Sequence, residues 1–221
     1  MAWYVFALVD AVPARPAGKG FASAVVFRPA AKFFAAAERR ADVPPTEFGS
    51  LQAHQQIVER IASSAPSILP VRFGTLLTVD EIEESLAERE EEIDESFAFV
   101  RGRRQMTWRV RSSRTSSPGR ARAASSTRQV RSGAAYLRAA AGAAMVPSSG
   151  VFRRIADTVG RLAVAERYQP RSSTLPDALY HLVDRTRLDA YATASKRLQS
   201  GAPIAALSGP WAPYAFVPEL F

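Results

Sequence analysis

Few side chains in this chain could do catalytic chemistry, and the two histidines come first among them. His54 and His181 are the only histidines, and no cysteine is present to act as a nucleophile or as a zinc ligand. No spacing links either histidine to a serine and a carboxylate as a catalytic triad. His54 falls on the apolar stripe of a helix, and His181 alternates with apolar residues in a strand near Asp184. We therefore predict two structural histidines, no catalytic residue, no metal ligand and no cofactor.

Carboxylates are the second candidate, because they crowd one short segment. Between Asp80 and Glu95 only Arg89 is basic, and the acids are Asp80, Glu81, Glu83, Glu84, Glu88, Glu90, Glu91, Glu92, Asp94 and Glu95. Acid–base catalysis needs two carboxyl groups that face each other across a cleft, and a cation site needs convergent oxygens. A row of acids along a helix provides neither. We predict a solvated face whose functional alternative is an electrostatic contact with a basic partner or with the arginine-rich segment.

Arginines form the third candidate. The net charge is +8, no acid occurs from Ser96 to Ala156, and eleven arginines lie between Arg101 and Arg138. This segment makes a basic nucleic-acid-binding module the alternative reading, because arginine binds phosphate well. Trp108 is the only aromatic residue between Arg101 and Ala135, so a platform for stacking bases is not evident. Gly18-Lys19-Gly20 lacks the spacing of a phosphate-binding loop.

The elements that must position these residues follow from apolar periodicity and from breaker residues. We predict strands at 3–9, 21–28, 67–74, 106–110, 179–183 and 203–207, and helices at about 46–62, 79–101, 134–146, 150–168 and 185–199. Residues 31–39 are ambiguous, since Ala35-Ala36-Ala37 favours helix and Phe33-Phe34 favours strand. Residues 111–132 are rich in Arg, Ser, Ala and Thr, which predicts a flexible linker.

Two helices carry more detailed predictions. In the first, Thr46 is the expected cap, and an apolar stripe is expected from Leu51, His54, Val58 and Ile61. In the second, Thr78 and Glu81 form a capping box. The second helix also places Ile82, Leu86, Ile93 and Phe97 on one face, and Gly102 lies just past its end. In the helix over 150–168 the expected inner face is Phe152, Ile155, Val159, Leu162 and Val164.

The predicted fold class is α+β with two domains. We expect an N-terminal α+β domain over 1–66, a modified ferredoxin-like domain over 67–209 and a C-terminal tail over 210–221. The second domain would carry the flexible segment 111–132 and a helical insert over 134–168. Three prolines hold the tail extended, and its aromatic residues Trp211, Tyr214 and Phe216 would form a sticky patch if left in water. We expect the tail to pack on the body and to leave part of its surface for a partner.

Targeting signals are not evident. The opening segment Ala2-Trp3-Tyr4-Val5-Phe6-Ala7-Leu8-Val9 has no basic residue before it, and Asp10 closes it, so we read it as a buried strand rather than a signal peptide. No segment has the ~20 apolar residues of a membrane helix, so no membrane is expected as a partner. These features and the absence of cysteine fit the cytoplasm.

Two motifs and several weaker segments give the chain a family resemblance. The specific motifs are Leu69-Pro70-Val71-Arg72-Phe73-Gly74 and Gly209-Pro210-Trp211-Ala212-Pro213-Tyr214. The supporting segments are Trp3-Tyr4-Val5-Phe6-Ala7-Leu8-Val9, Ala53-His54-Gln55-Gln56-Ile57-Val58, Arg101-Gly102-Arg103, Gly133-Ala134-Ala135-Tyr136-Leu137 and Leu179-Tyr180-His181-Leu182-Val183-Asp184. In this order they cover nearly the whole chain. The sequence resembles the gas vesicle protein GvpF/GvpL family.

This resemblance implies a non-catalytic accessory protein of gas vesicle assembly. Such a protein would contact GvpA, the small and hydrophobic shell protein, and other accessory proteins, with no cofactor. The candidate partner-binding residues are Arg72, Glu84, Glu88, Glu91, Trp211, Tyr214 and Phe216. Two stretches depart from the family pattern, namely 111–132 and Arg104-Gln105-Met106. The alternatives are the nucleic-acid-binding module over 101–138 and an enzyme that uses His54 or His181.

Overall fold

The computed structural model describes residues 2–110, 150–172, 176–199 and 205–221. The chain divides into two compact units, and both ends of the chain build the first one. The first unit comprises Met1–Gln105 and Pro210–Phe221, and the second comprises Met106–Gly209. The sequence predicts a domain boundary after residue 66 instead. The difference arises because the strand at Ile68–Pro70 and the two acidic helices after it pack on the N-terminal sheet.

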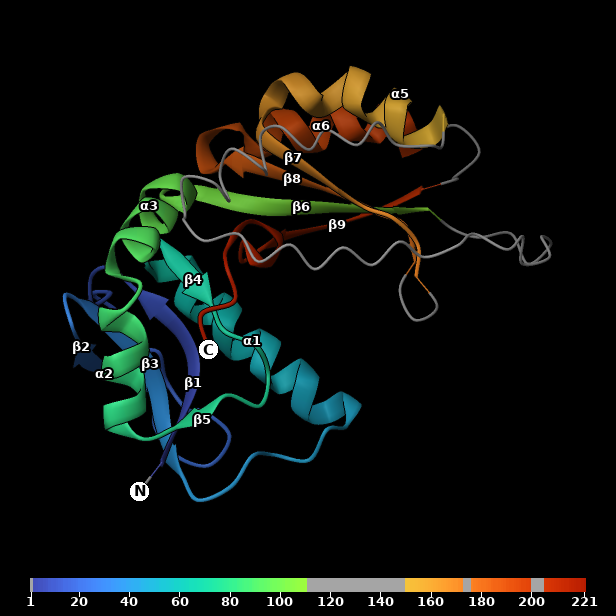
Figure 1. Cartoon of the computed structure of the whole chain (residues 1–221). Coiled ribbons are helices and arrows are strands. Elements are labelled where there is room, and N and C mark those ends of the chain that lie inside the picture. The colour runs from blue at the N-terminus through green and yellow to red at the C-terminus, as the bar shows by residue number, and fades with distance from the viewer. Residues whose placement is uncertain (1, 111–149, 173–175, 200–204) are drawn as a thin grey trace. The chain divides into compact units, whose positions relative to one another are not determined.

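An antiparallel sheet forms the centre of the first unit. Its strands are β1 (Ala2–Val9), β2 (Val26–Ala30), β3 (Phe33–Arg40), β4 (Ile68–Pro70) and β5 (Leu76–Leu77), in the order β2-β3-β1-β4 with β5 also paired to β1 (Figure 1). The ambiguous segment is therefore a strand, and its three alanines are fully buried. The predicted strand over 21–28 was displaced, since β2 begins at Val26.

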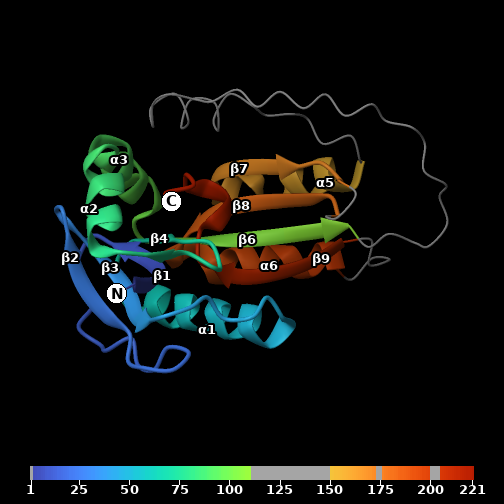
Figure 2. The same ribbon diagram turned by 60° about the horizontal axis from the view of Figure 1, so that its bottom comes forward.

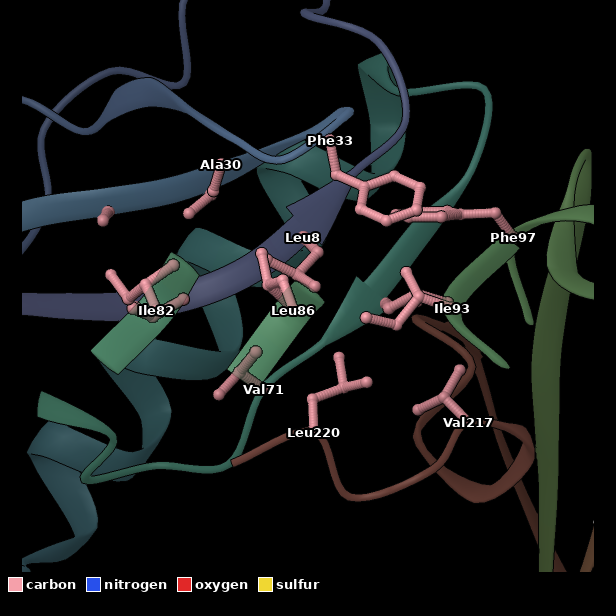
Figure 3. Close-up of a cluster of buried hydrophobic side chains, with 14 of the residues drawn as sticks. Leu8, Ala30, Phe33, Val71, Ile82, Leu86, Ile93, Phe97, Val217 and Leu220 are labelled. Atoms are coloured by element: carbon pink, nitrogen blue, oxygen red, sulfur yellow. The ribbon is translucent and has the colours of Figure 1, made fainter. Parts of the chain in front are cut away.

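Opposite faces of β1 contribute to two cores. Val5 and Leu8 belong to a cluster with Ile82, Leu86 and other apolar residues of the acidic helices (Figure 3). Tyr4 and Phe6 belong to a second cluster, which includes Ile57, Val58 and Ile61. The central position of β1 follows from this double burial, because a strand covered on both faces must be apolar on both.

Helix α1 (Phe48–Ser64) differs from its prediction at its N-terminal end. Its N-cap residue is Glu47, no side chain caps it, and Thr46 lies outside. The buried face consists of His54, Ile57, Val58, Ile61 and Ala62. Leu51 is 43% exposed, so its predicted place on the buried face was wrong. Leu51 lies on the side of Val58, but it is in the first turn of the helix, two turns before Val58.

The acidic segment forms two helices rather than one. Helix α2 (Val79–Ala87) begins with the predicted capping box of Thr78 and Glu81, and α3 (Glu90–Val100) follows a break at Arg89. The break turns the chain, and both helices still bury their apolar faces in one cluster. The four predicted face residues Ile82, Leu86, Ile93 and Phe97 are all buried there (Figure 3). Gly102 lies just past α3 with φ of 68°, as a helix-ending glycine should.

The second unit has its own sheet and core. Its elements are β6 (Arg103–Val110), α5 (Gly150–Val159), β7 (Ala163–Gln169), β8 (Ala178–Asp184), α6 (Leu188–Gln199) and β9 (Ala205–Trp211), with short 3₁₀ turns at Gly160–Leu162 and Arg185–Arg187. The sheet order is β7-β8-β6-β9, and α5 and α6 lie side by side on one face (Figures 1 and 2). Their core includes Trp108, Phe152, Ile155, Leu179 and Tyr191.

The prediction for residues 150–168 was wrong in its second half. The helix predicted over 150–168 stops at Val159, and Ala163–Gln169 pairs with β8 as an edge strand. Val164, predicted to face inward, is 41% exposed. The second unit therefore has the order strand–helix–strand–strand–helix–strand, from β6 to β9, with β7 as its second strand. The sequence predicts the same order but begins it with the strand at 67–74, which belongs to the first unit.

The tail returns from β9 to the first unit. It contains a 3₁₀ turn at Tyr214–Phe216, and Val217 and Leu220 enter the cluster beneath α2 and α3 (Figure 3). In the described part of the chain, no helix is long and apolar enough to cross a membrane.

Candidate partner-binding site

A partly buried carboxylate on α1, that of Glu59, holds the start of the tail. Glu59 Oε1 accepts a hydrogen bond from the Ala212 N–H at 2.6 Å, and Glu59 Oε2 pairs with the Arg104 guanidinium. Arg104 also donates to the carbonyl of Pro210 at 3.1 Å. The next contact comes from Gln105, whose Oε1 accepts from the Ala215 N–H at 2.8 Å. Arg104 and Gln105, which follow one another at the start of β6, thus supply two side chains that hold the tail.

These contacts determine how much of the predicted aromatic patch is exposed for binding a partner. Phe216 is only 2% exposed, so it contributes to the core and presents almost no surface to a partner. Trp211 and Tyr214 are half-buried. Burial raises the pKa of the Tyr214 hydroxyl above its ordinary value. The tail packs on the body as predicted, and Trp211 and Tyr214 remain the aromatic candidates.

Arg72, the exposed residue of the central motif, contacts the other end of the tail. Its guanidinium pairs with Glu219, and both side chains are largely exposed, at 73% and 65%. The Glu219 carbonyl accepts from Arg89, which also pairs with Glu92 at 2.8 Å. An ion pair this exposed contributes little to stability, so Arg72 is available to exchange Glu219 for another carboxylate.

The acidic candidates lie on the outside of α2 and α3. Glu84, Glu88 and Glu91 are exposed, which agrees with the predicted solvated face. Some neighbouring acids are paired, since Lys32 contacts Asp94 and Glu90. Hydrogen bonds to Asp94 and then Glu90 raise the pKa of Lys32. The backbone N–H of Thr78 lowers the pKa of Glu81.

His54 is part of a buried hydrogen-bonded network that shapes the central motif. The Tyr4 hydroxyl accepts from the Gly74 N–H at 3.0 Å, so its proton points to His54 Nδ1, also at 3.0 Å. His54 Nε2 must then donate to the Val71 carbonyl at 3.1 Å. The loop between β4 and β5 is thereby fixed at both ends, and Gly74 adopts φ of 96°, which favours glycine. His54 is 4% exposed and both ring nitrogens are occupied, as expected for a structural histidine.

This network predicts a loss of stability in acid. Burial lowers the pKa of His54 to about 4 from an ordinary value of 6.5. His54 binds a proton more readily in the unfolded chain than in the folded one. Its contribution to the free energy of unfolding is therefore complete above pH 6.5 and declines as the pH falls towards 4. The decline attributable to this group is about 3 kcal/mol.

The measurement is urea unfolding of the parent chain and of His54→Gln between pH 7 and pH 4. Glutamine can keep both hydrogen bonds and does not titrate, so the difference in unfolding free energy between the two chains should narrow as the pH falls. A constant difference would contradict the proposed burial of a neutral imidazole.

His181 lies in a second buried network, in the second unit. Trp108 Nε1 donates to the Tyr191 hydroxyl at 2.8 Å, Tyr191 donates to His181 Nδ1 at 2.6 Å, and His181 Nε2 donates to Glu166 Oε2 at 2.8 Å. His181 and Tyr191 are both 0% exposed. Burial raises the pKa of Tyr191 above its ordinary value. The order carboxylate–imidazole–hydroxyl resembles a triad, but the hydroxyl is buried and accepts from Trp108.

Sequence reasoning missed both partners of His181. It pointed to Asp184, which is close in sequence, whereas Glu166 lies opposite His181 in the β7–β8 pairing. Only a correct assignment of residues 163–169 as a strand would have revealed that register.

Tyr191→Phe tests this network. Removing the hydroxyl leaves the Trp108 N–H and His181 Nδ1 buried without a partner, so we expect a loss of about 1–3 kcal/mol in unfolding free energy. The matched control is Tyr180→Phe, because Tyr180 is partly buried and donates only to Gln169 at 2.9 Å. Thermal unfolding of both variants measures the difference, and equal midpoints would contradict a structural role for the network.

The arginine-rich segment is described only in part, since residues 111–138 lie outside the described residues. Three of its described members have partners within the first unit. Arg101 pairs with Asp10, Arg103 donates to the Phe99 carbonyl, and Arg104 pairs with Glu59. These three arginines are thus used for internal contacts, whereas Arg109 is exposed. Within the described ranges there is also no cluster of three histidine or acidic side chains that could hold a metal ion.

The fold and these networks define an α+β protein whose histidines serve as internal hydrogen-bonding centres. The family model described as "Gas vesicle synthesis protein GvpL/GvpF" matches residues 2–218. The chain belongs to the GvpL/GvpF family of gas vesicle proteins and therefore has a role in gas vesicle formation.

Two solved structures share the fold at low sequence identity. The crystal structure of GvpF from Microcystis aeruginosa is 12% identical with a TM-score of 0.71, and the match covers 97% of this chain and 98% of that one. The crystal structure of GvpF from Anabaena sp. PCC7120 is 14% identical with a TM-score of 0.67, and the match covers 97% of each chain. No curated protein sequence matches the chain significantly.

Proposed function

We propose that this chain is a non-catalytic accessory protein of gas vesicle assembly that contacts the shell protein GvpA and other accessory proteins. The observation that carries the proposal is the family match over residues 2–218. The described surface supports it, because its candidate groups suit protein contacts: the exposed Glu84, Glu88 and Glu91, the exposed Arg72 and the half-buried Trp211 and Tyr214. The proposed location is the cytoplasm, at the gas vesicle.

Different candidate groups suit different partners. The α2–α3 face presents exposed carboxylates, so it suits a partner with basic side chains and would bind it in a salt-dependent way. Trp211 combines apolar area with a polar tip, which is typical of contact residues at protein interfaces, whereas the Tyr214 hydroxyl is buried and only its half-buried ring is a candidate. The chain would thus be able to bind a basic accessory protein at the α2–α3 face and an apolar partner at another surface at the same time.

The test is deletion and complementation in a vesicle-forming host without a paralogue. We expect the deletion strain to lose vesicles, measured by light scattering and electron microscopy, and the wild-type gene to restore them. Affinity-tagged full-length chain should also capture GvpA from the complemented strain. Normal vesicles in the deletion strain would overturn the assembly role, and vesicle loss without GvpA capture would overturn the proposed contact.

A further inference from the structure

The outer surface of the helices in the second unit is basic. Helices α5 and α6 lie side by side on one face of the sheet (Figures 1 and 2), and the buried residues of α5 all belong to the core of the unit. Arg153 and Arg154 are exposed and lie on the opposite side of α5. The α5–α6 face, as we call the exposed bases of both helices and of the 3₁₀ turn after α5, consists of Arg153, Arg154, Arg161, Lys196 and Arg197. The exposed acids of the two helices are Asp157 and Asp189, so bases outnumber acids on this surface.

The two units differ in the sign of their net charge. The first unit has 16 Asp and Glu against 12 Lys and Arg, a net charge of −4, and the second has 5 against 17, a net charge of +12. Charge is therefore separated within the chain more strongly than the overall value of +8 suggests. Between two copies of the chain, units of the same kind repel each other, whereas the first unit of one copy attracts the second unit of another.

The acids on the α2–α3 face are placed where they cost the first unit stability. Glu84 lies in the last turn of α2 and Glu88 is its C-cap residue, at the end where the helix dipole disfavours negative charge. The two carboxylates are four residues apart, a spacing at which like charges repel. Arg89, the nearest base, pairs with Glu92. Among the residues that the structure describes, Glu84, Glu88 and Glu91 form no ion pair. An exposed basic surface would relieve this repulsion, and a surface that breaks local rules in this way is typical of a binding surface.

A second copy of the chain supplies such a surface. The α5–α6 face is basic and exposed, and it lies on the unit of opposite net charge. Each exposed ion pair contributes less than about 1 kcal/mol, so several pairs must form together and the contact should be weak and sensitive to salt.

We propose that the chain associates with itself head to tail, with the α2–α3 face of one copy bound to the α5–α6 face of the next. The two faces differ, so the contact is heterologous and copies join in rows or in closed rings. This inference goes beyond the proposed function, because it requires neither GvpA nor another accessory protein. A basic accessory protein would compete with the contact for the α2–α3 face.

Sedimentation velocity of the purified full-length chain, measured over a range of concentrations, tests this contact. One test variant, Glu84→Arg/Glu88→Arg, reverses charge on the α2–α3 face. The other, Arg153→Glu/Arg154→Glu, reverses charge on the α5–α6 face. All four residues are exposed, so both variants should fold, and thermal unfolding of each checks this.

The matched control is Asp42→Arg/Glu47→Arg. Both residues are exposed and lie in the first unit, between β3 and α1. The control therefore changes the net charge of the first unit as much as Glu84→Arg/Glu88→Arg does, but it leaves the α2–α3 face unaltered.

We expect the wild type and the control to associate as the concentration rises at about 0.05 M salt, and at least about tenfold less tightly at about 0.5 M salt. Each test variant alone should associate at least about tenfold less tightly than the wild type at low salt. An equimolar mixture of the two test variants should recover association, because the unaltered α2–α3 face of one meets the unaltered α5–α6 face of the other. Both variants keep a positive net charge, so a general attraction between them would not explain the recovery.

Three results would overturn the proposal. The first is a wild type that stays monomeric at every concentration at low salt. The second is association that neither test variant weakens, which would place the contact on other surfaces. The third is a mixture that fails to recover association, since the two faces would then not bind each other.

Discussion

Removing residues 216–221 should unfold the first unit. Phe216, Val217 and Leu220 are at most 8% exposed, and the last two lie in the cluster with Leu86 and Ile93 (Figure 3). Burying each such side chain contributes about 1.5–3 kcal/mol, so the truncation would remove about 5–9 kcal/mol. This is comparable with the whole stability of a typical domain, about 5–15 kcal/mol. Hydrogen exchange should then show protection lost throughout β1 and α1.

The control for the truncation is Glu219→Ala, in the same part of the tail. It removes only an exposed ion pair with Arg72, which should cost less than about 1 kcal/mol. A truncated chain that keeps slow exchange in β1 and α1 would show that the tail is an accessory to the first unit and not a part of its core.

Glu59→Leu should be the most damaging single substitution near the start of the tail. It leaves the Arg104 guanidinium buried without its carboxylate, and it removes the acceptor for the Ala212 N–H. Breaking a buried pair on one side costs about 3–5 kcal/mol. Urea unfolding of the variant measures this cost directly.

The double variant Glu59→Leu/Arg104→Met separates charge from packing. With both charges gone, no buried ion remains uncompensated, so most of the lost stability should return. If the double variant were less stable than Glu59→Leu, the dominant role of Arg104 would lie in its bond to the Pro210 carbonyl rather than in its pairing with Glu59.

Local signals in the sequence predicted local structure well. The capping box at Thr78 and Glu81 needs only four residues, and it is present as predicted. The common face of Ile82, Leu86, Ile93 and Phe97 also held, although the helix breaks at Arg89. Spacings of four and seven are those of one continuous helix, so periodicity predicted a single helix and could not reveal the break.

Features that depend on tertiary pairing were missed. Ala163–Gln169 reads as a continuation of helix, and only its pairing with β8 makes it a strand. Leu51 completes an apolar spacing in the sequence, but it lies in the first turn of α1 and is 43% exposed. His54 and His181 both lie in buried hydrogen-bonded networks, and their partners Tyr4, Tyr191 and Glu166 could not be predicted without the register of the strands.

The way the chain closes on itself has a consequence for its synthesis. The first unit begins at the N-terminus and is completed by Val217 and Leu220, which the ribosome adds only after the entire second unit. Until then the cluster that contains Val71, Leu86 and Ile93 lacks two of its buried members on the nascent chain. The second unit is continuous in sequence and can fold earlier, so translation itself should order the two folding events.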